Sequence, residues 1–249
     1  MYKKLSAPDF KVTFNNMQIE SGFFVDYQES EDEHIHRCIL TPYGEAAEAL
    51  KDADITDAIV EMGCEDEYST LLTGHGYNMD GAESILVKDD MVRLENTIIQ
   101  ETFLNCYPDE VMRYILDQCG INAFRLSTVH YGQKGVFSVP RMNAVQAIQE
   151  LHRGWNIDLS FGFFDGVFYW GCEPEQEELY ELDSNNILDL EQNGKLWTAE
   201  ILAVPWIRVG QVVLITNSQF DGLARIKKCV IKEKSTGKTD MYIQFIGVG

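Results

Sequence analysis

The chain has 249 residues and a mass of 28.4 kDa, and 45% of its residues are hydrophobic, which is enough apolar surface for a core and excludes a wholly disordered chain. Its 20 basic and 40 acidic side chains give a net charge of −20 at pH 7, which argues against binding to a nucleic-acid backbone or to an anionic membrane. Because the sequence contains no apolar run of about 18 residues, we expect a soluble protein without a Sec-type signal.

The acidic side chains are concentrated in the first third of the chain. Residues 1–90 carry 6 basic and 20 acidic side chains, residues 91–171 carry 6 and 8, and residues 172–249 carry 8 and 12. A change of composition of this kind, near residue 90, is typical of a domain boundary. The three segments are therefore our three predicted domains.

Short strands joined by polar turns are predicted for residues 1–90. Residues 10–14 and 17–19 alternate apolar and polar side chains on either side of Asn15-Asn16, a pattern typical of a β-hairpin. Residues 22–27 and 35–41 predict a second hairpin. Its acidic connection, residues 28–34, should form an exposed tip because charged side chains are costly to bury. A short helix or turn is predicted between Pro42 and Asp54, and further strands are predicted at residues 55–62, 69–73 and 83–87.

Two amphipathic helices are predicted for residues 91–171. The first begins at Pro108 and ends at Gly120. The second is capped by Asn143, with Gln146 three residues later, and Gly154 follows its end. Strands are expected after the helices, at residues 121–126 and 155–161, and a hairpin with Asp165-Gly166 at its turn is expected over residues 163–170. The pattern indicates a small α/β module.

Residues 172–249 return to a strand pattern. An acidic connector at residues 173–183 precedes strand-like runs at residues 196–204, 212–216, 223–231 and 241–246. This spacing favours a second β-barrel or sandwich. The fold class predicted for the whole chain is α+β, mainly β, with two barrel domains, 1–90 and 172–249, that flank a small α/β insert, 91–171, with two short helices.

No common catalytic or nucleotide-binding motif occurs in the sequence. The six cysteines, at positions 38, 64, 106, 119, 172 and 229, include no Cys-x-x-Cys pair, so we expect reduced thiols packed as small hydrophobes. His34 and His36 could share one strand face, and we interpret them as part of an exposed polar hairpin rather than as metal ligands. No catalytic residue, metal or cofactor is predicted.

Two catalytic alternatives stay open. With 40 acidic side chains, a carboxylate pair suited to glycoside hydrolysis can arise by chance, and four tryptophans with 11 tyrosines could form a sugar-binding platform. The alternative function is therefore an acidic β-rich carbohydrate-binding protein or a glycoside hydrolase. A protease-like site that combines a thiol with His75, His130 or His152 is a further alternative.

One passage in the last third is more specific than the rest, since residues 205–211 read Pro-Trp-Ile-Arg-Val-Gly-Gln before a pair of strands. It follows, in order, segments at residues 10–16, 55–64, 71–77, 85–94, 107–121, 138–151 and 164–169, and it precedes one at residues 223–232. In their order and spacing these segments resemble the late-control protein D and baseplate-hub family of contractile phage tails and phage-tail-like particles.

The resemblance implies a structural hub that is not an enzyme. It implies a homotrimer with two tube-like barrels per chain, so that six barrels form a ring. This ring joins the hexameric tail tube to the trimeric spike. Its central channel is acidic and allows DNA or a tape-measure protein to pass. The implied partners are a second and third copy, the tail tube protein, the central spike protein, the tape-measure protein and other baseplate proteins. The implied location is the baseplate of a virion, a bacteriocin or another contractile injection system, assembled in the bacterial cytoplasm, with no membrane and no specific nucleic-acid binding.

Candidate site residues follow from the ring that the resemblance implies. The density of acidic side chains in the predicted tip suggests that it faces the lumen or its rim, and these residues are Glu29, Glu31, Asp32 and Glu33. Aromatic residues on predicted strands are candidates for subunit contacts, and these are Phe23, Phe24 and Trp206.

Overall fold

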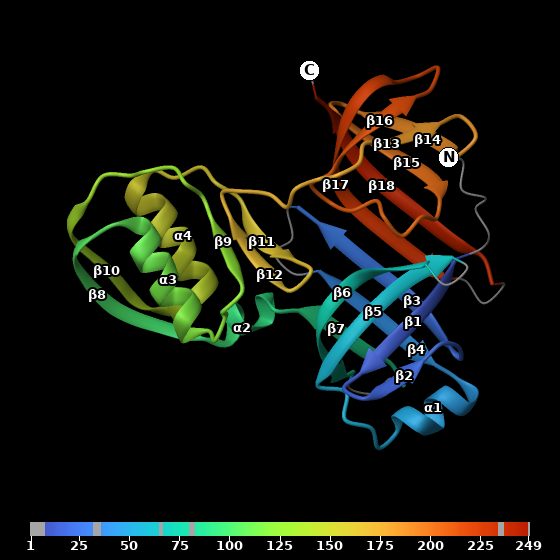
Figure 1. The fold of residues 1–249 in the computed structure, drawn as a ribbon, viewed down its shortest axis with the longest axis horizontal. Coiled ribbons are helices and arrows are strands. Elements are labelled where there is room, and N and C mark those ends of the chain that lie inside the picture. The colour runs from blue at the N-terminus through green and yellow to red at the C-terminus, as the bar shows by residue number, and fades with distance from the viewer. Residues whose placement is uncertain (1–7, 32–35, 65–66, 80–82, 234–236, 249) are drawn as a thin grey trace. The chain divides into compact units, whose positions relative to one another are not determined.

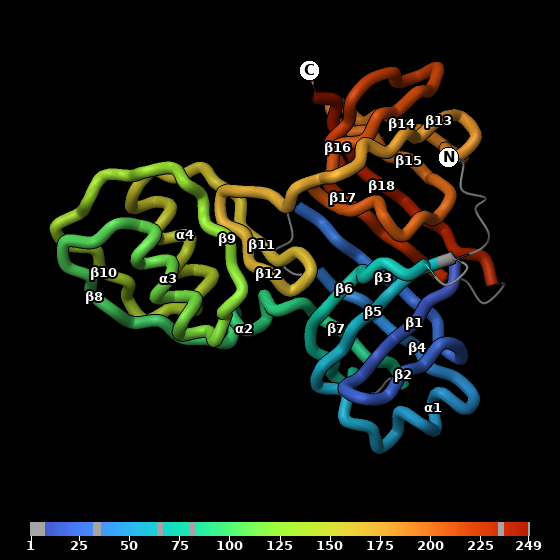
Figure 2. Tube along the Cα trace, in the orientation of Figure 1, coloured from blue at the N-terminus to red at the C-terminus, as the bar shows by residue number. Residues whose placement is uncertain are grey.

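The fold is built mainly from β-strands, as the sequence predicts (Figure 1). A computed structural model describes residues 8–31, 36–64, 67–79, 83–233 and 237–248. The chain divides into two compact units, a larger one formed by Met1–Asp89 with Glu175–Gly249 and a smaller one formed by Asp90–Pro174. Figure 2 traces the chain through both units. No helix among the described residues is long and apolar enough to span a bilayer.

The larger unit is a 13-stranded sheet with one short helix. Its elements before the smaller unit are β1 (Asp9–Phe14), β2 (Met17–Ile19), β3 (Phe23–Ser30), β4 (Arg37–Pro42), α1 (Gly44–Leu50), β5 (Asp57–Cys64), β6 (Glu67–Asn78) and β7 (Ile85–Asp89). Those after it are β13 (Tyr180–Asp183), β14 (Ile187–Asn193), β15 (Leu196–Leu202), β16 (Val212–Thr216), β17 (Asp221–Glu233) and β18 (Thr239–Gly247). The first hairpin is confirmed, because Asn15 takes the left-handed conformation (φ 46°) that its turn requires.

The N-terminal and C-terminal parts of the larger unit join where β3 pairs with β17. The strand order is β14-β15-β18-β17-β3-β4-β7-β6-β5-β1-β2, with β16 also paired to β17 and β13 to β16. The antiparallel register of β3 with β17 runs from Ser30 opposite Lys228 to Asp26 opposite Lys232. The described strands of the larger unit form one continuous sheet, and the pairings among them do not close into a ring. The division of this unit into two barrel domains, 1–90 and 172–249, therefore stays a prediction.

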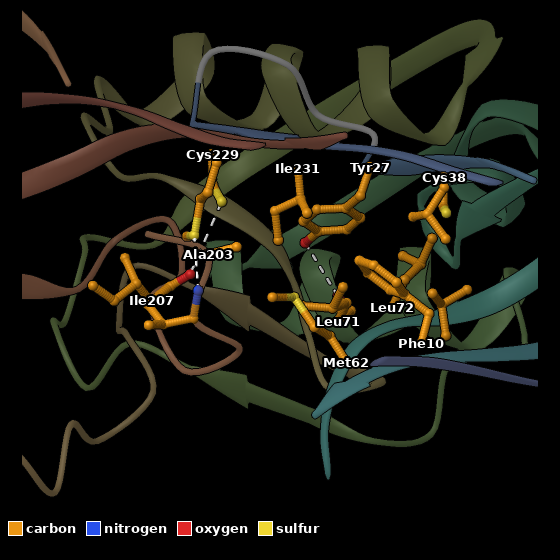
Figure 3. Close-up of a cluster of buried hydrophobic side chains, with 14 of the residues drawn as sticks. Phe10, Tyr27, Cys38, Met62, Leu71, Leu72, Ala203, Ile207, Cys229 and Ile231 are labelled. Carbon is orange, nitrogen blue, oxygen red and sulfur yellow. Dashed lines mark hydrogen bonds between the residues drawn. The ribbon is translucent and has the colours of Figure 1, made fainter. Parts of the chain in front are cut away.

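Both halves of the larger unit contribute to a single apolar core. Alternate residues of β3, β17 and β18 point inward, so Tyr27, Ile231 and Phe245 are buried. Figure 3 shows Tyr27 and Ile231 in the same cluster as Met62 and Leu71, and the Tyr27 hydroxyl donates a hydrogen bond to the Leu71 carbonyl at 3.1 Å. Packing of this kind stabilises the two halves as one body.

The smaller unit packs helices against a two-stranded sheet. It contains α2 (Met91–Asn96), β8 (Ile98–Cys106), α3 (Pro108–Gln118), β9 (Phe124–Leu126), β10 (Lys134–Asn143), α4 (Ala144–Trp155), β11 (Phe161–Phe164) and β12 (Val167–Trp170). β8 pairs with β10, and β11, β12 and β9 form a second small sheet. The predicted helices are confirmed: Pro108 opens α3, and Asn143 Oδ1 accepts a hydrogen bond from the Gln146 amide at 2.9 Å at the start of α4. The Asp165-Gly166 hairpin is also confirmed, with both residues at positive φ.

Three details of the predicted secondary structure are wrong. The strand predicted at residues 155–161 is absent, because α4 continues to Trp155 and ends at Asn156 in the left-handed conformation (φ 54°). Gly154 therefore lies inside the last turn, where a Cβ would come within 2.9 Å of the Phe137 ring. The predicted connector at residues 173–183 includes a strand, β13, which pairs with β16.

Candidate functional site

A buried ion pair joins the N-terminal and C-terminal parts of the larger unit. Arg208, in the connection between β15 and β16, donates from Nε to Glu29 Oε2 at 3.0 Å and from Nη2 to Glu29 Oε1 at 3.2 Å. Its Nη1 donates to the Thr70 carbonyl of β6 at 2.7 Å, and the Val209 amide donates to Glu29 Oε2 at 3.2 Å. Both charged side chains are buried. The pair therefore holds β3, β6 and the 206–209 segment together.

Two further titratable groups, His36 and Asp89, lie beside this pair. His36 Nδ1 is 3.5 Å from Glu29 Oε1 and 3.8 Å from Asp89 Oδ2, and the His36 amide donates to Asp89 Oδ2 at 3.4 Å. Burial favours a raised pKa for Glu29, but the charges of Arg208 and His36, together with the hydrogen bonds from Arg208 and Val209, outweigh it and hold that pKa below its usual range. Glu29 is therefore an ionised and fully engaged carboxylate.

The predicted exposed acidic tip is wrong for Glu29. Its exposed fraction is only 1%, because Arg208, 179 positions away in the sequence, supplies the counter-charge that makes burial tolerable. Glu31 is half-buried and accepts from Arg225 Nη2 at 3.0 Å and from Lys227 Nζ. Asp32 and Glu33 lie outside the described residues, as does His34. A role of this segment in lining a lumen stays a prediction.

The three aromatic candidates for subunit contacts lie in different environments. Phe23 is buried in the core of the larger unit. Phe24 is half-buried, with its ring 4.8 Å from that of Tyr43, which is 49% exposed. Trp206 is half-buried against the core, with its ring 6.1 Å from that of Tyr180. Phe24 and Trp206 thus retain exposed area for a contact, whereas Phe23 acts mainly in packing.

Most of the described cysteines are buried, and two of the histidines form hydrogen bonds. Five cysteines, at positions 38, 106, 119, 172 and 229, are free thiols. Burial raises the pKa of the Cys38 and Cys229 thiols, so neither is a ready nucleophile. His152 Nε2 accepts a hydrogen bond from the Trp170 indole at 2.7 Å, and His75 Nδ1 donates to the Thr56 carbonyl at 3.2 Å. Within the described part of the chain, no group of three or more His, Cys, Asp or Glu side chains is arranged to hold a metal ion.

Comparison with known proteins identifies the fold. No protein-family model and no curated protein sequence matches the chain. Among solved structures, the chain is similar to the 43 kDa tail protein of prophage MuSo2 from Shewanella oneidensis, with a TM-score of 0.70, 9% identity and 96% of each chain covered. It is equally similar to a tail protein from Neisseria meningitidis MC58, with a TM-score of 0.70, 11% identity and 98% of each chain covered.

A third similar structure comes from a secretion system. The E. coli c3393 protein is described as a component of the type VI secretion system with structural similarity to the T4 bacteriophage tail proteins gp27 and gp5. The TM-score is 0.67 at 9% identity, and the match covers 96% of this chain and 77% of the other. The chain therefore has a fold found in phage tail proteins along nearly its whole length. This confirms the predicted resemblance at the level of the fold.

Proposed function

We propose that this chain is a structural protein of the tail baseplate, the hub that joins the tail tube to the central spike. The observation that carries the proposal is the match to two tail proteins over at least 96% of the chain, which includes the smaller unit as well as the sheet. A likeness limited to one strand-rich half would be compatible with many β-proteins. A likeness that extends over both units supports a tail component more strongly than a likeness of the sheet alone.

The proposed assembly is a homotrimer. Each copy contributes its two strand-rich halves, joined through β3 and β17, so three copies supply six halves to a ring that matches a hexameric tube on one side and a trimeric spike on the other. Phe24 and Trp206, which retain exposed aromatic area, are the proposed subunit contacts. The acidic net charge keeps DNA or a tape-measure segment from adhering to the proposed channel.

Electron microscopy of particles labelled with an antibody against this chain tests the proposed position. Label at the baseplate end of the tube is the expected result. Label along the whole tube, or free protein with no label on particles, contradicts it. The proposed partners, which are the tube, spike, tape-measure and other baseplate proteins, should be recovered together with the labelled end of the particle.

No observation favours the carbohydrate-active alternative. The hollow beside Glu31 is lined by one carboxylate together with Lys227 and Lys228, and the hollow beside Glu101 also has one carboxylate. Hydrolysis of a glycosidic bond generally needs two. Trp170 is fully buried, and Trp197 is partly buried, with its ring stacked on Phe245 and in edge contact with Phe220. The proposal accordingly assigns no catalytic step to this chain.

A further inference from the structure

The two-stranded sheet of the smaller unit has one covered and one solvent-exposed face. On the inner face, Phe137 and Val139 are buried, and the Phe103 ring lies 5.2 Å from the Tyr114 ring of α3. On the outer face, Leu104 and Val136 lie opposite each other in the register and are 69% and 62% exposed. The exposed residues of β8 on this face, Ile98, Gln100, Thr102 and Leu104, are uncharged, as are Val136 and Ser138 opposite them on β10. An uncharged face of this length is unusual on a chain with a net charge of −20.

The outer edge of β8 is open along its length. Among the described strands, β8 pairs with β10 alone. The Thr102 amide donates to the Glu101 side chain, Oε1, at 2.8 Å, so it points away from β10. The neighbouring Thr102 and Ser138 hydroxyls meet at 3.0 Å, as expected for a pair that does not exchange backbone hydrogen bonds. In an antiparallel strand, every second residue directs its backbone N–H and C=O groups to the same edge. Gln100, Thr102 and Leu104 therefore direct these groups to the open edge of β8.

The two edges of this sheet differ in their protection. β10 contains Pro140, the positively charged Lys134 and Arg141, and a register shift between Val139 and Met142, which are features that block strand addition. β8 contains no proline, lysine, arginine or glycine. Its single charged residue is Glu101, which accepts from the Thr102 amide through Oε1 and from the Tyr114 hydroxyl of α3 through Oε2 at 3.4 Å. An unprotected edge beside an apolar face is suited to strand addition.

We propose that the open edge of β8 binds an extended strand of a partner protein, which adds to the sheet as a third strand. The partner strand carries uncharged side chains at alternate positions, over Leu104 and Val136, and a lysine or arginine beside Glu101. A carbonyl of that strand accepts from the Thr102 amide, and the displaced Glu101 carboxylate pairs with the partner's cation. The inference goes beyond the proposed hub function and does not depend on it.

Charge favours a different protein over a second copy of this chain as the occupant. Two β8 edges placed together would bring two Glu101 carboxylates near each other, and like charges repel. A cationic strand removes this repulsion and neutralises the only charge on β8. The occupant is therefore an extended, basic and otherwise uncharged segment.

The probe is a synthetic nine-residue peptide of alternating Val and Thr with one central Lys, compared with the same peptide carrying Glu instead. Fluorescence anisotropy with the full chain measures affinity, and amide hydrogen exchange locates binding. The Lys peptide should bind about tenfold more tightly than the Glu peptide and should slow exchange at Thr102. Unchanged exchange at Thr102 in the saturated complex overturns the proposal. So does protection of Thr102 that rises with protein concentration alone, because the occupant is then a second copy.

Two proline variants form a matched pair. Thr102→Pro removes an amide that faces the open edge and should weaken binding of the Lys peptide about tenfold. Ser138→Pro changes the cross-strand partner of Thr102, on the opposite edge, and should leave the affinity within about twofold. Equal losses in the two variants overturn the proposal. If Thr102→Pro does not fold, the Glu101→Lys variant is used instead. This variant should bind the Glu peptide more tightly than the Lys peptide. If it still binds the Lys peptide more tightly, the proposal is overturned.

Discussion

At the scale of the residue, the larger unit depends on the charge pair between Glu29 and Arg208. Removing one partner of a buried pair leaves an uncompensated charge, which is much more costly than losing a surface pair. Arg208→Met should therefore lower the free energy of unfolding by about 3–5 kcal/mol in urea titrations. Arg225→Met is the matched control, because its partner Glu31 is half-buried and also pairs with Lys227, and its loss should stay below about 1 kcal/mol. Equal losses of unfolding free energy in the two variants would show that the Glu29–Arg208 pair stabilises the fold no more than the Glu31–Arg225 pair does.

The same carboxylate makes stability depend on pH in the acid range. The pKa of Glu29 is lower in the folded chain than its ordinary value, so the folded state favours the ionised form. The stabilisation is fully present above about pH 4.5 and is lost as the pH falls through the lower folded-state pKa. The difference in unfolding free energy between the wild type and Glu29→Gln should thus be present at pH 5 and shrink below about pH 4. A difference independent of pH down to 2 would rule out this role.

At the scale of the element, pairing of β3 with β17 decides which parts of the chain fold alone. A fragment of residues 1–89 loses β17 as the neighbour of β3, and it loses Arg208 as the partner of Glu29. We expect this fragment to be unfolded or aggregated, since it exposes a long strand edge. Residues 90–174 have their own core, which includes Val111, Ile115 and Leu151, and should unfold cooperatively. Amide spectra of both fragments test this, and a well-dispersed spectrum for residues 1–89 would favour separate barrel domains.

The sequence predicts those elements whose signals are local. Asn15 and Asp165-Gly166 mark turns because few other residues adopt positive φ, and Pro108 and Asn143 mark helix starts through their own backbone chemistry. The burial of Glu29 could not be predicted in this way, because its cause lies 179 positions away. β8 was also not predicted, because Ile98 and Leu104 are apolar but point to solvent. Their exposure obscures the alternation of apolar and polar side chains that a half-buried strand normally shows.

At the scale of the whole molecule, the net charge opposes association of identical chains. Repulsion between copies that each carry −20 is weakened when salt shortens the range of the electrostatic interaction. A ring of three copies should therefore form more readily as the salt concentration rises, provided that its contacts are apolar. The half-buried Phe24 and Trp206 are the aromatic contacts proposed for it.

The most direct test of the central claim, that this chain forms a trimeric tail hub, is its absolute mass in solution by light scattering across protein and salt concentration. We expect a mass that approaches three times 28.4 kDa at high protein concentration and at a salt concentration that screens the acidic surface. A mass of one chain under every condition, or a stable dimer, would contradict it.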